Sequence, residues 1–176
     1  MTGEPNGVAL RPLALADILT VRRWRNDPDV ARYMYSDHEI GEAEHARWFG
    51  QALDAPDRVY WIVELDGDPV GLANVYAITR PHRRAYWAFY LADPRVRGRG
   101  VGSYVELFVM RHAFVELGLE KLCCEVLAGN EAVIRMHQKF GFVLEGVLRR
   151  HVWKDAQPMD VVTLAILADE WRQRHG

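Results

Sequence analysis

Arginine and glycine alternate in one short stretch of the chain. Residues 95–103 read Arg-Val-Arg-Gly-Arg-Gly-Val-Gly-Ser, after the strand-like run Tyr86–Leu91 and before the helix-like run Tyr104–Leu117. Glycine lets a backbone come close to an anion and adopt positive φ. The free N–H groups of a first helical turn, together with the helix dipole, favour negative charge. This strand–turn–helix pattern therefore predicts a cradle for a pyrophosphate.

The spacing of the glycines excludes two common phosphate-binding motifs. A Walker A loop needs Lys followed by Ser or Thr after its last glycine, and no Lys stands between Gly102 and Ser103. A dinucleotide-binding loop needs glycines spaced G-x-G-x-x-G. Gly98, Gly100 and Gly102 are spaced G-x-G-x-G, so the stretch belongs to another kind of phosphate ligand.

A second motif follows the next strand-like run, Lys121–Leu127. Asn130 begins a helix-like segment through Lys139, and Gly141-Phe142 leads into the following strand. An asparagine amide can hydrogen-bond an amide-rich ligand or cap the helix. Gly141 permits a sharp turn and Phe142 is suited to the core. The two motifs stand in order, with a strand between them.

Length and composition indicate one globular domain spanning residues 1–176. The chain is 49% hydrophobic and 26% charged, with a net charge of −2, which is ordinary for a soluble protein and argues against a nucleic-acid partner. A polar N-terminus and the lack of a long apolar run predict a cytoplasmic protein with no signal peptide and no membrane contact. The neighbouring residues Cys123 and Cys124 are poorly placed to bridge each other.

The order of the elements predicts early helices, then antiparallel strands, then strand–helix–strand crossovers. Asp66-Gly67-Asp68 is a strong hairpin signal between two strands. Gly118 is a good residue to follow a helix end. The predicted strands are residues 8–13, 59–65, 70–78, 84–91, 121–127, 142–151 and 159–166, and the helices are residues 18–25, 29–34, 42–53, 104–117, 130–139 and 168–174.

Both motifs resemble those of the GNAT N-acetyltransferase superfamily. Arg97-x-x-Gly100-x-Gly102 is similar to its acyl-CoA pyrophosphate loop, and Asn130 with Lys139-x-Gly141-Phe142 to its second signature. The resemblance covers Leu10–Trp171. It implies an α/β (α+β) fold with a mixed, mostly antiparallel sheet of about seven strands, splayed at the acetyl-CoA cleft and flanked by helices. It also implies acetyl-CoA as cosubstrate, bound by Tyr90, Leu91, Arg97, Gly98, Arg99, Gly100, Val101, Gly102, Ser103 and Asn130.

Further segments resemble the UDP-4-amino-sugar N-acetyltransferases of the pseudaminic acid pathway. They include Val21–Asn26, His45-x-x-Trp48-Phe49, Trp87-x-Phe89-Tyr90 and Glu145-Gly146-x-Leu148-Arg149. This resemblance implies acetylation of the 4-amino group of a UDP-linked deoxysugar destined for flagellin glycosylation. Protein N-terminal (ribosomal-protein-type) amines and polyamines are alternative acceptors. A non-catalytic acyl-CoA-binding regulator is a remoter alternative.

The resemblance also implies a direct attack of the amine on the thioester. A backbone N–H near Tyr90 and Leu91 would stabilise the oxyanion. The superfamily's usual acid, a tyrosine, is replaced by His137, seven residues after Asn130 and on the same helix face. An imidazolium can protonate the leaving thiolate, although a packed histidine is the alternative. Glu125 is one candidate base, with structural ion pairing as its alternative role, and His45 is another.

The predicted acceptor-binding residues lie on the early helices and on the strand at residues 84–91. Arg25 is suited to a diphosphate, His45 to a nucleotide sugar, and Tyr90 and Trp87 to stacking. Asn26 is included, with helix termination as its alternative role. No element carries metal-ligand spacing, so no metal is expected. Apolar residues in the last strands permit a homodimer.

Overall fold

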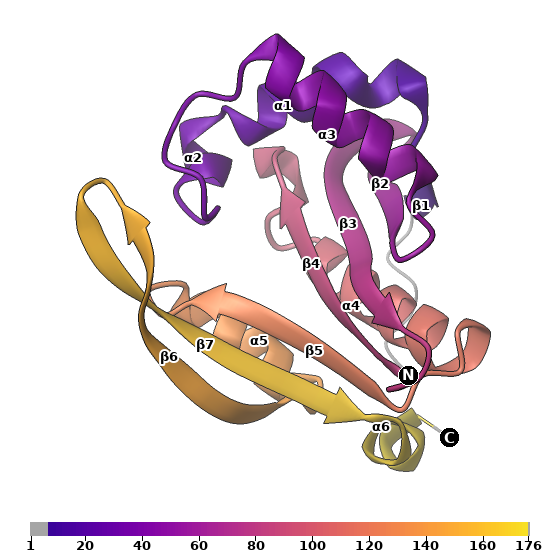
Figure 1. Ribbon diagram of the computed structural model, residues 1–176. Helices are drawn as coiled ribbons and strands as arrows, with labels where there is room; N and C mark the ends of the chain where they lie inside the picture. The colour runs from indigo at the N-terminus through magenta and orange to yellow at the C-terminus, as the bar shows by residue number, and fades with distance from the viewer. Residues whose placement is uncertain (1–6, 176) are drawn as a thin grey trace. The chain divides into compact units, whose positions relative to one another are not determined.

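The computed structural model describes residues 7–175, with the helices and strands labelled in Figure 1. The strands are β1 (Val8–Pro12), β2 (Val59–Leu65), β3 (Asp68–Thr79), β4 (Arg84–Leu91), β5 (Lys121–Leu127), β6 (Val143–Lys154) and β7 (Gln157–Leu167). The helices are α1 (Ile18–Arg25), α2 (Pro28–Ala31), α3 (Glu42–Asp54), α4 (Val101–Arg111), α5 (Glu131–Lys139) and α6 (Ala168–His175). Short 3₁₀ turns cover Leu15–Asp17 and Pro94–Val96, and a π-helical turn covers His112–Glu116.

Within residues 7–175 the strands form one seven-stranded sheet in the order β1-β2-β3-β4-β5-β7-β6. β1 pairs antiparallel with β2, and β7 pairs antiparallel with both β5 and β6. β4 and β5 pair in parallel over Arg84–Tyr86 and Lys121–Cys123. This mixed, mostly antiparallel sheet with helices confirms the predicted fold class. The splaying of β4 and β5 further along stays a prediction.

The chain divides into two compact units. One contains the chain up to Asn74 together with Phe89–Val105, and the other contains Val75–Ala88 and everything from Glu106 onward. The chain passes between them within β3, β4 and α4. The expectation of a single domain stays a prediction.

In the first unit, α1 and α3 pack their apolar residues on β2 and β3. Val21 and Trp24 from α1 and Phe49 from α3 meet Ile62 and Leu72 from the strands. β2 is buried through Tyr60–Val63, as expected of a strand covered on both faces. The hairpin predicted at Asp66-Gly67 is confirmed, because both residues have positive φ, 55° and 87°. This unit carries the turn after β4 on a rigid base.

In the second unit, β6 and β7 form a hairpin longer than predicted. Asp155 and Ala156 both have positive φ, 49° and 56°, so a two-residue turn joins the strands where the sequence lacks the glycine that usually marks one. β6 stands at the end of the strand order and exposes Val143, Val147 and Trp153. The expected homodimer stays a prediction.

Candidate active site

The end of β4 is held against β3 at a glycine. A Cβ atom added to Gly71 would overlap the carbonyl oxygen of Tyr90 and lie 3.1 Å from the Cα atom of Leu91. The N–H of Ala92 donates to the carbonyl oxygen of Val70 at 2.8 Å. Sequence reasoning missed Gly71, although a glycine inside a strand often marks close backbone approach. The oxyanion role of a backbone N–H near Tyr90 and Leu91 stays a prediction.

The turn after β4 is built to reverse the chain and begin a helix. The side chain of Asp93 accepts a hydrogen bond from the N–H of Arg95 at 2.8 Å, and Pro94 starts a 3₁₀ turn. Val96 is buried and anchors the turn. Gly98 and Gly100 have φ of +73° and +72°, with open space where a side chain would stand. These glycines are therefore required for conformation rather than for room.

Helix α4 begins directly after Gly100 and offers unpaired N–H groups. The N–H of Tyr104 bonds the carbonyl oxygen of Gly100 at 3.1 Å, and the preceding amides of the first turn have no intrahelical acceptor. Gly98 and Gly100 are exposed, Gly102 and Ser103 are half-buried, and Val101 is buried. Free N–H groups and the helix dipole make this turn fit to bind a diphosphate.

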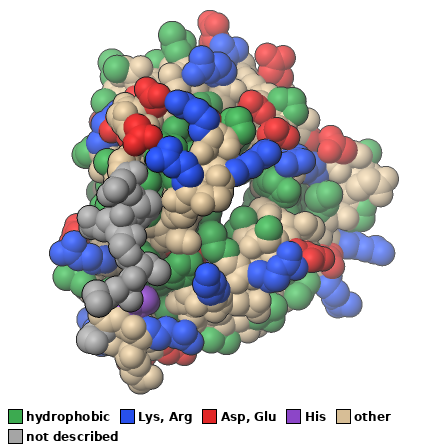
Figure 2. Space-filling view, turned by 180° about the vertical axis from the view of Figure 1, so that it is seen from behind, with side chains coloured by type: hydrophobic (Ala, Val, Ile, Leu, Met, Phe, Trp, Pro, Cys, Tyr) green, Lys and Arg blue, Asp and Glu red, His purple; other side chains and the backbone are tan. Residues whose placement is uncertain are grey.

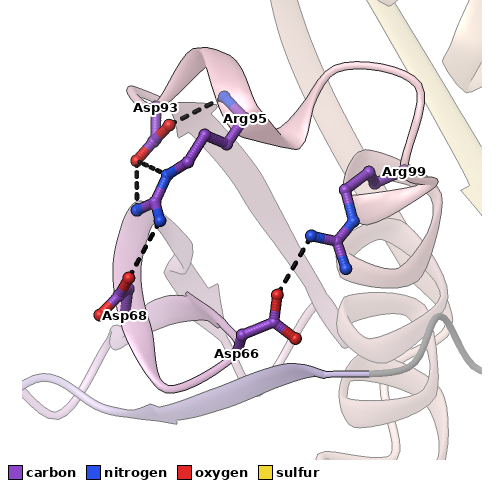
Figure 3. A network of polar contacts seen from close by, with 5 residues as sticks. All are labelled: Asp66, Asp68, Asp93, Arg95 and Arg99. Carbon is purple, nitrogen blue, oxygen red and sulfur yellow. Dashed lines mark hydrogen bonds and ion pairs between the residues drawn. The ribbon is translucent and has the colours of Figure 1, made fainter.

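The arginines of the turn differ in how much charge they offer (Figure 3). Arg95 contacts Asp93 at 2.7 Å and Asp68 at 3.0 Å, and Arg99 contacts Asp66 at 3.1 Å. Arg97 is exposed and forms no ion pair with any residue in the described range. The sequence predicts three cationic side chains around the anion. Asp66 and Asp68 of the β2–β3 hairpin neutralise the charge of two of them, Arg99 and Arg95.

Opposite charges also mix over the surface more generally. In the face shown in Figure 2, Lys and Arg side chains are interspersed with Asp and Glu. Such interspersion agrees with a net charge of −2. An anion bound at the turn after β4 would therefore be recognised by local groups rather than by a broad basic field.

Two predicted acceptor residues, Arg25 and Asn26, have defined contacts at the end of α1. The guanidinium of Arg25 lies 4.8 Å from the ring centroid of Trp48, over its face. The side-chain amide of Asn26 donates to the carbonyl oxygen of Ile40 at 3.0 Å and accepts from the N–H of Ile40 at 2.8 Å. Asn26 thus fastens the loop before α3, while Arg25 remains half-buried.

The predicted acceptor residue His45 is buried between α1 and α3. It is 1% exposed, its Nε2–H donates to the carbonyl oxygen of Ile18 at 2.7 Å, and its ring packs on Trp48 and Phe49. Burial lowers the pKa of His45. These contacts give His45 a structural role, and its contact with an acceptor stays a prediction.

Tyr90, predicted for both the cofactor and the acceptor, places a hydroxyl inside the first unit. Its ring meets Trp24 edge-on with centroids 6.3 Å apart. Its hydroxyl oxygen is buried and has no hydrogen-bond partner among the described residues. Burial raises the pKa of Tyr90. The hydroxyl is therefore neutral, and the contact of Tyr90 with a ligand stays a prediction.

In the second unit, His137 pairs with a carboxylate that sequence reasoning missed. Nδ1 of His137 lies 2.8 Å from Oε1 of Glu106 on α4, and the two residues are 3% and 0% exposed. The ring of His137 packs against Trp87 and Phe142. Burial raises the pKa of Glu106. The only sequence signal for Glu106 is a charge amid the apolar residues of α4, where carboxylates are rarely fully buried.

Two further predicted residues of this unit flank the turn between β5 and α5. Glu125 is half-buried on β5 and lies opposite Thr163 on β7. Asn130 precedes α5, and its side chain makes no capping hydrogen bond to that helix within the described chain. Its amide is thus not committed to the helix end. The roles of Glu125 as base and Asn130 as cofactor ligand stay predictions.

Comparison with known families identifies the chain. The model of the acetyltransferase (GNAT) domain matches residues 8–143. The chain belongs to the GNAT acetyltransferase family. It is accordingly an acetyl-CoA-dependent N-acetyltransferase.

Individual GNAT relatives differ in how much of the chain they match. The chain is 26% identical over 170 residues with spermidine N(1)-acetyltransferase of Escherichia coli K12, covering 97% of this chain and 91% of the relative. It is 25% identical over 128 residues with the acetyltransferase PseH of Campylobacter jejuni, covering 73% of this chain and 78% of the relative. The longer match favours the polyamine alternative over the nucleotide-sugar interpretation.

A solved structure supports the GNAT fold. Spermidine N-acetyltransferase from Vibrio cholerae, in complex with CoA and spermine, superposes with a TM-score of 0.87 at 20% identity and covers 94% of this chain and 98% of its own. At this identity the likeness concerns the fold alone.

The residues of this GNAT chain fit the diphosphate of CoA. The turn at Gly98–Ser103 presents amide N–H groups at the start of α4, and Arg97 supplies a cation. No group of three or more His, Cys, Asp or Glu side chains within residues 7–175 is arranged to hold a metal ion. Within the same range no helix is both long and apolar enough to span a membrane.

Proposed function

We propose that this acetyltransferase transfers the acetyl group of acetyl-CoA to a primary amine of a polyamine such as spermidine. The similarity to a spermidine N-acetyltransferase over 97% of the chain supports this acceptor class. A second support is the charge of one segment in the first unit.

That segment runs from Asp27 to Glu44 and is strongly acidic. It contains six carboxylates, Asp27, Asp29, Asp37, Glu39, Glu42 and Glu44, against one arginine, Arg32. Asp37 and Glu39 are exposed in the loop before α3. Asp29 pairs with Arg32, Glu42 with Arg22 and Glu44 with His38, so Asp37 and Glu39 are the carboxylates that the proposal uses. A polyamine carries several ammonium groups, so exposed carboxylates raise its local concentration and orient it. This acidic segment is the observation that carries the proposal.

The chemistry requires the chain to hold a thioester, stabilise an oxyanion and move two protons. Acetyl-CoA supplies the activated acetyl group. The amides of Gly98–Ser103 and Arg97 hold the diphosphate, the amide of Asn130 bonds the pantetheine arm, and a backbone N–H near Leu91 stabilises the oxyanion. His137 protonates the departing thiolate, and Glu125 accepts the proton that the amine nitrogen loses.

The test of the acceptor is release of free CoA from acetyl-CoA with a panel of amines. We expect turnover with spermidine or spermine and little with UDP-linked amino sugars or peptides with free N-termini. Replacing Asp37 with Asn and Glu39 with Gln should raise KM for spermidine about fivefold and leave KM for acetyl-CoA unchanged, because each exposed charge contributes weakly. The matched control is Asp54→Asn at the end of α3. Equal loss in the control, or no turnover with polyamines, would contradict the proposal.

A UDP-linked amino sugar, as in the pseudaminic acid pathway, is the second candidate acceptor. The observation that favours it is Arg25, whose guanidinium lies over Trp48 and is suited to a diphosphate but would repel a polyamine. Replacing Arg25 with Gln should weaken turnover of a UDP-amino sugar and leave or improve that of spermidine. CoA release only with peptides would indicate a protein N-terminal acceptor, and no release with any amine would indicate a non-catalytic acyl-CoA-binding regulator.

A further inference from the structure

The pair formed by Glu106 and His137 joins two helices inside the second unit. Oε1 of Glu106 on α4 lies 2.8 Å from Nδ1 of His137 on α5. The ring centroid of His137 lies 5.1 Å from that of Trp87 on β4 and 5.3 Å from that of Phe142. The aromatic walls keep water from the pair, so its contact is far stronger than an exposed one.

The burial of this pair is unusual for a carboxylate. Glu106 is fully buried, and its second oxygen, Oε2, has no hydrogen-bond partner among the described residues. A buried carboxylate without full hydrogen bonding is costly. Among the described residues, the hydrogen bond of this carboxylate is made to His137.

The geometry constrains how the pair can hold protons. Nδ1 of His137 faces α4, so Nε2 points along the opposite edge of the ring. One proton must lie between Nδ1 and Oε1, whether the ring or the carboxyl carries it. The thiol of Cys124 on β5 also lies within electrostatic range of Glu106, and burial raises its pKa, so it stays neutral and supplies no competing charge.

We propose that Glu106 is a positioning residue for His137. Glu106 fixes the orientation and tautomer of the imidazole and balances its charge, while Nε2–H of His137 serves as the proton donor. This inference rests on the role proposed above for His137. When the C–S bond breaks, the Nε2 proton passes to the sulfur. The contact proton then stays on Nδ1 against the Glu106 carboxylate. The amine nitrogen loses its proton to Glu125, the base proposed above, and solvent carries a proton from Glu125 back to Nε2 after the products leave.

The test compares Glu106→Gln with His137→Asn. Glutamine keeps an acceptor oxygen for Nδ1–H but removes the balancing charge. We expect kcat to fall about tenfold and KM for acetyl-CoA to change less than twofold, because the imidazolium loses its counter-charge. The matched control is Glu116→Gln, which removes the carboxylate paired with His112 at 2.6 Å, a half-exposed His–Glu pair outside the site. It should change none of these values.

The outcomes distinguish the positioning role of Glu106 from the proposed acid role of His137. If His137→Asn lowers kcat while Glu106→Gln leaves kcat unchanged, Glu106 is not a positioning residue. If His137→Asn leaves kcat unchanged, the role of His137 itself is contradicted. A further readout is the ¹⁵N spectrum of His137 in the wild-type protein, recorded where the ring is neutral. It does not depend on whether any variant folds. We expect the Nδ1–H tautomer of His137, and an Nε2–H tautomer there would overturn the inference.

Discussion

The turn at residues 93–103 and the Glu106–His137 pair are both built from charged side chains, yet they lie in opposite surroundings. In the turn, the exposed Arg95 pairs with Asp68 and Asp93, and the exposed Arg99 pairs with Asp66. In the pair, one carboxylate meets one imidazole with both side chains buried. The first arrangement shares its charges among several exposed groups, whereas the second is a single carboxylate–imidazole contact shielded from water.

The pKa directions of two carboxylates express this difference. Hydrogen bonds from Arg95 lower the pKa of Asp93, while burial raises the pKa of Glu106. An exposed carboxylate beside a cation is stable in its charged form. Because salt and water screen exposed charges, removing such an ion pair changes the free energy of unfolding little. A buried one depends on its partner for every favourable interaction. Substitutions should therefore cost much in the pair and little among the exposed ion pairs.

The largest expected effect is on the pair. Glu106→Ala leaves Nδ1 of His137 buried without its acceptor, and we expect a loss of about 3 kcal/mol in the free energy of unfolding. Removing both polar partners in Glu106→Leu with His137→Phe should recover most of that loss, since apolar groups can fill the same space. Urea denaturation of Glu106→Leu, His137→Phe and the double variant measures the coupling. Additive losses would show that the two side chains do not depend on each other.

The next largest effect tests whether the backbone beneath the end of β4 tolerates an added methyl group. Gly71→Ala would press a methyl group on the backbone of Tyr90, and we expect a loss of about 2 kcal/mol because backbone cannot move aside as a flexible side chain can. Gly50→Ala is the matched control in α3, where nothing lies within 4 Å of the added atom, and it should gain about 0.5 kcal/mol. Thermal unfolding separates the two, and equal changes would contradict the close contact.

The smallest effect concerns the arginines of the turn. Arg97→Gln should weaken CoA binding about tenfold, because it removes a cation that no carboxylate compensates, and a charged hydrogen bond to phosphate contributes about 1.5 kcal/mol. Arg95→Gln should weaken it less than twofold, since Asp68 and Asp93 already engage that side chain. Titration calorimetry at low and high salt measures both. A larger effect from Arg95 would show that its ion pairs exchange for the ligand.

The sequence by itself determined most of the elements and the local chemistry of the turn. Each helix and strand that it predicts is present, with ends that differ by a few residues, because hydrophobic period, proline and glycine act within a few residues of chain. Asp66-Gly67 and Gly98-x-Gly100 mark positive-φ turns for the same local reason. The motif around His137 likewise identified the helix on which an acid would stand.

Only the tertiary structure decided which groups meet. It placed Glu106 beside His137, Gly71 beneath Tyr90, and Asp66 against Arg99. Each contact joins residues distant in sequence, and nothing in the local pattern of either residue specifies its partner. Partners of this kind follow from how strands and helices pack, since packing fixes which side chains share a low-dielectric space and which remain in water.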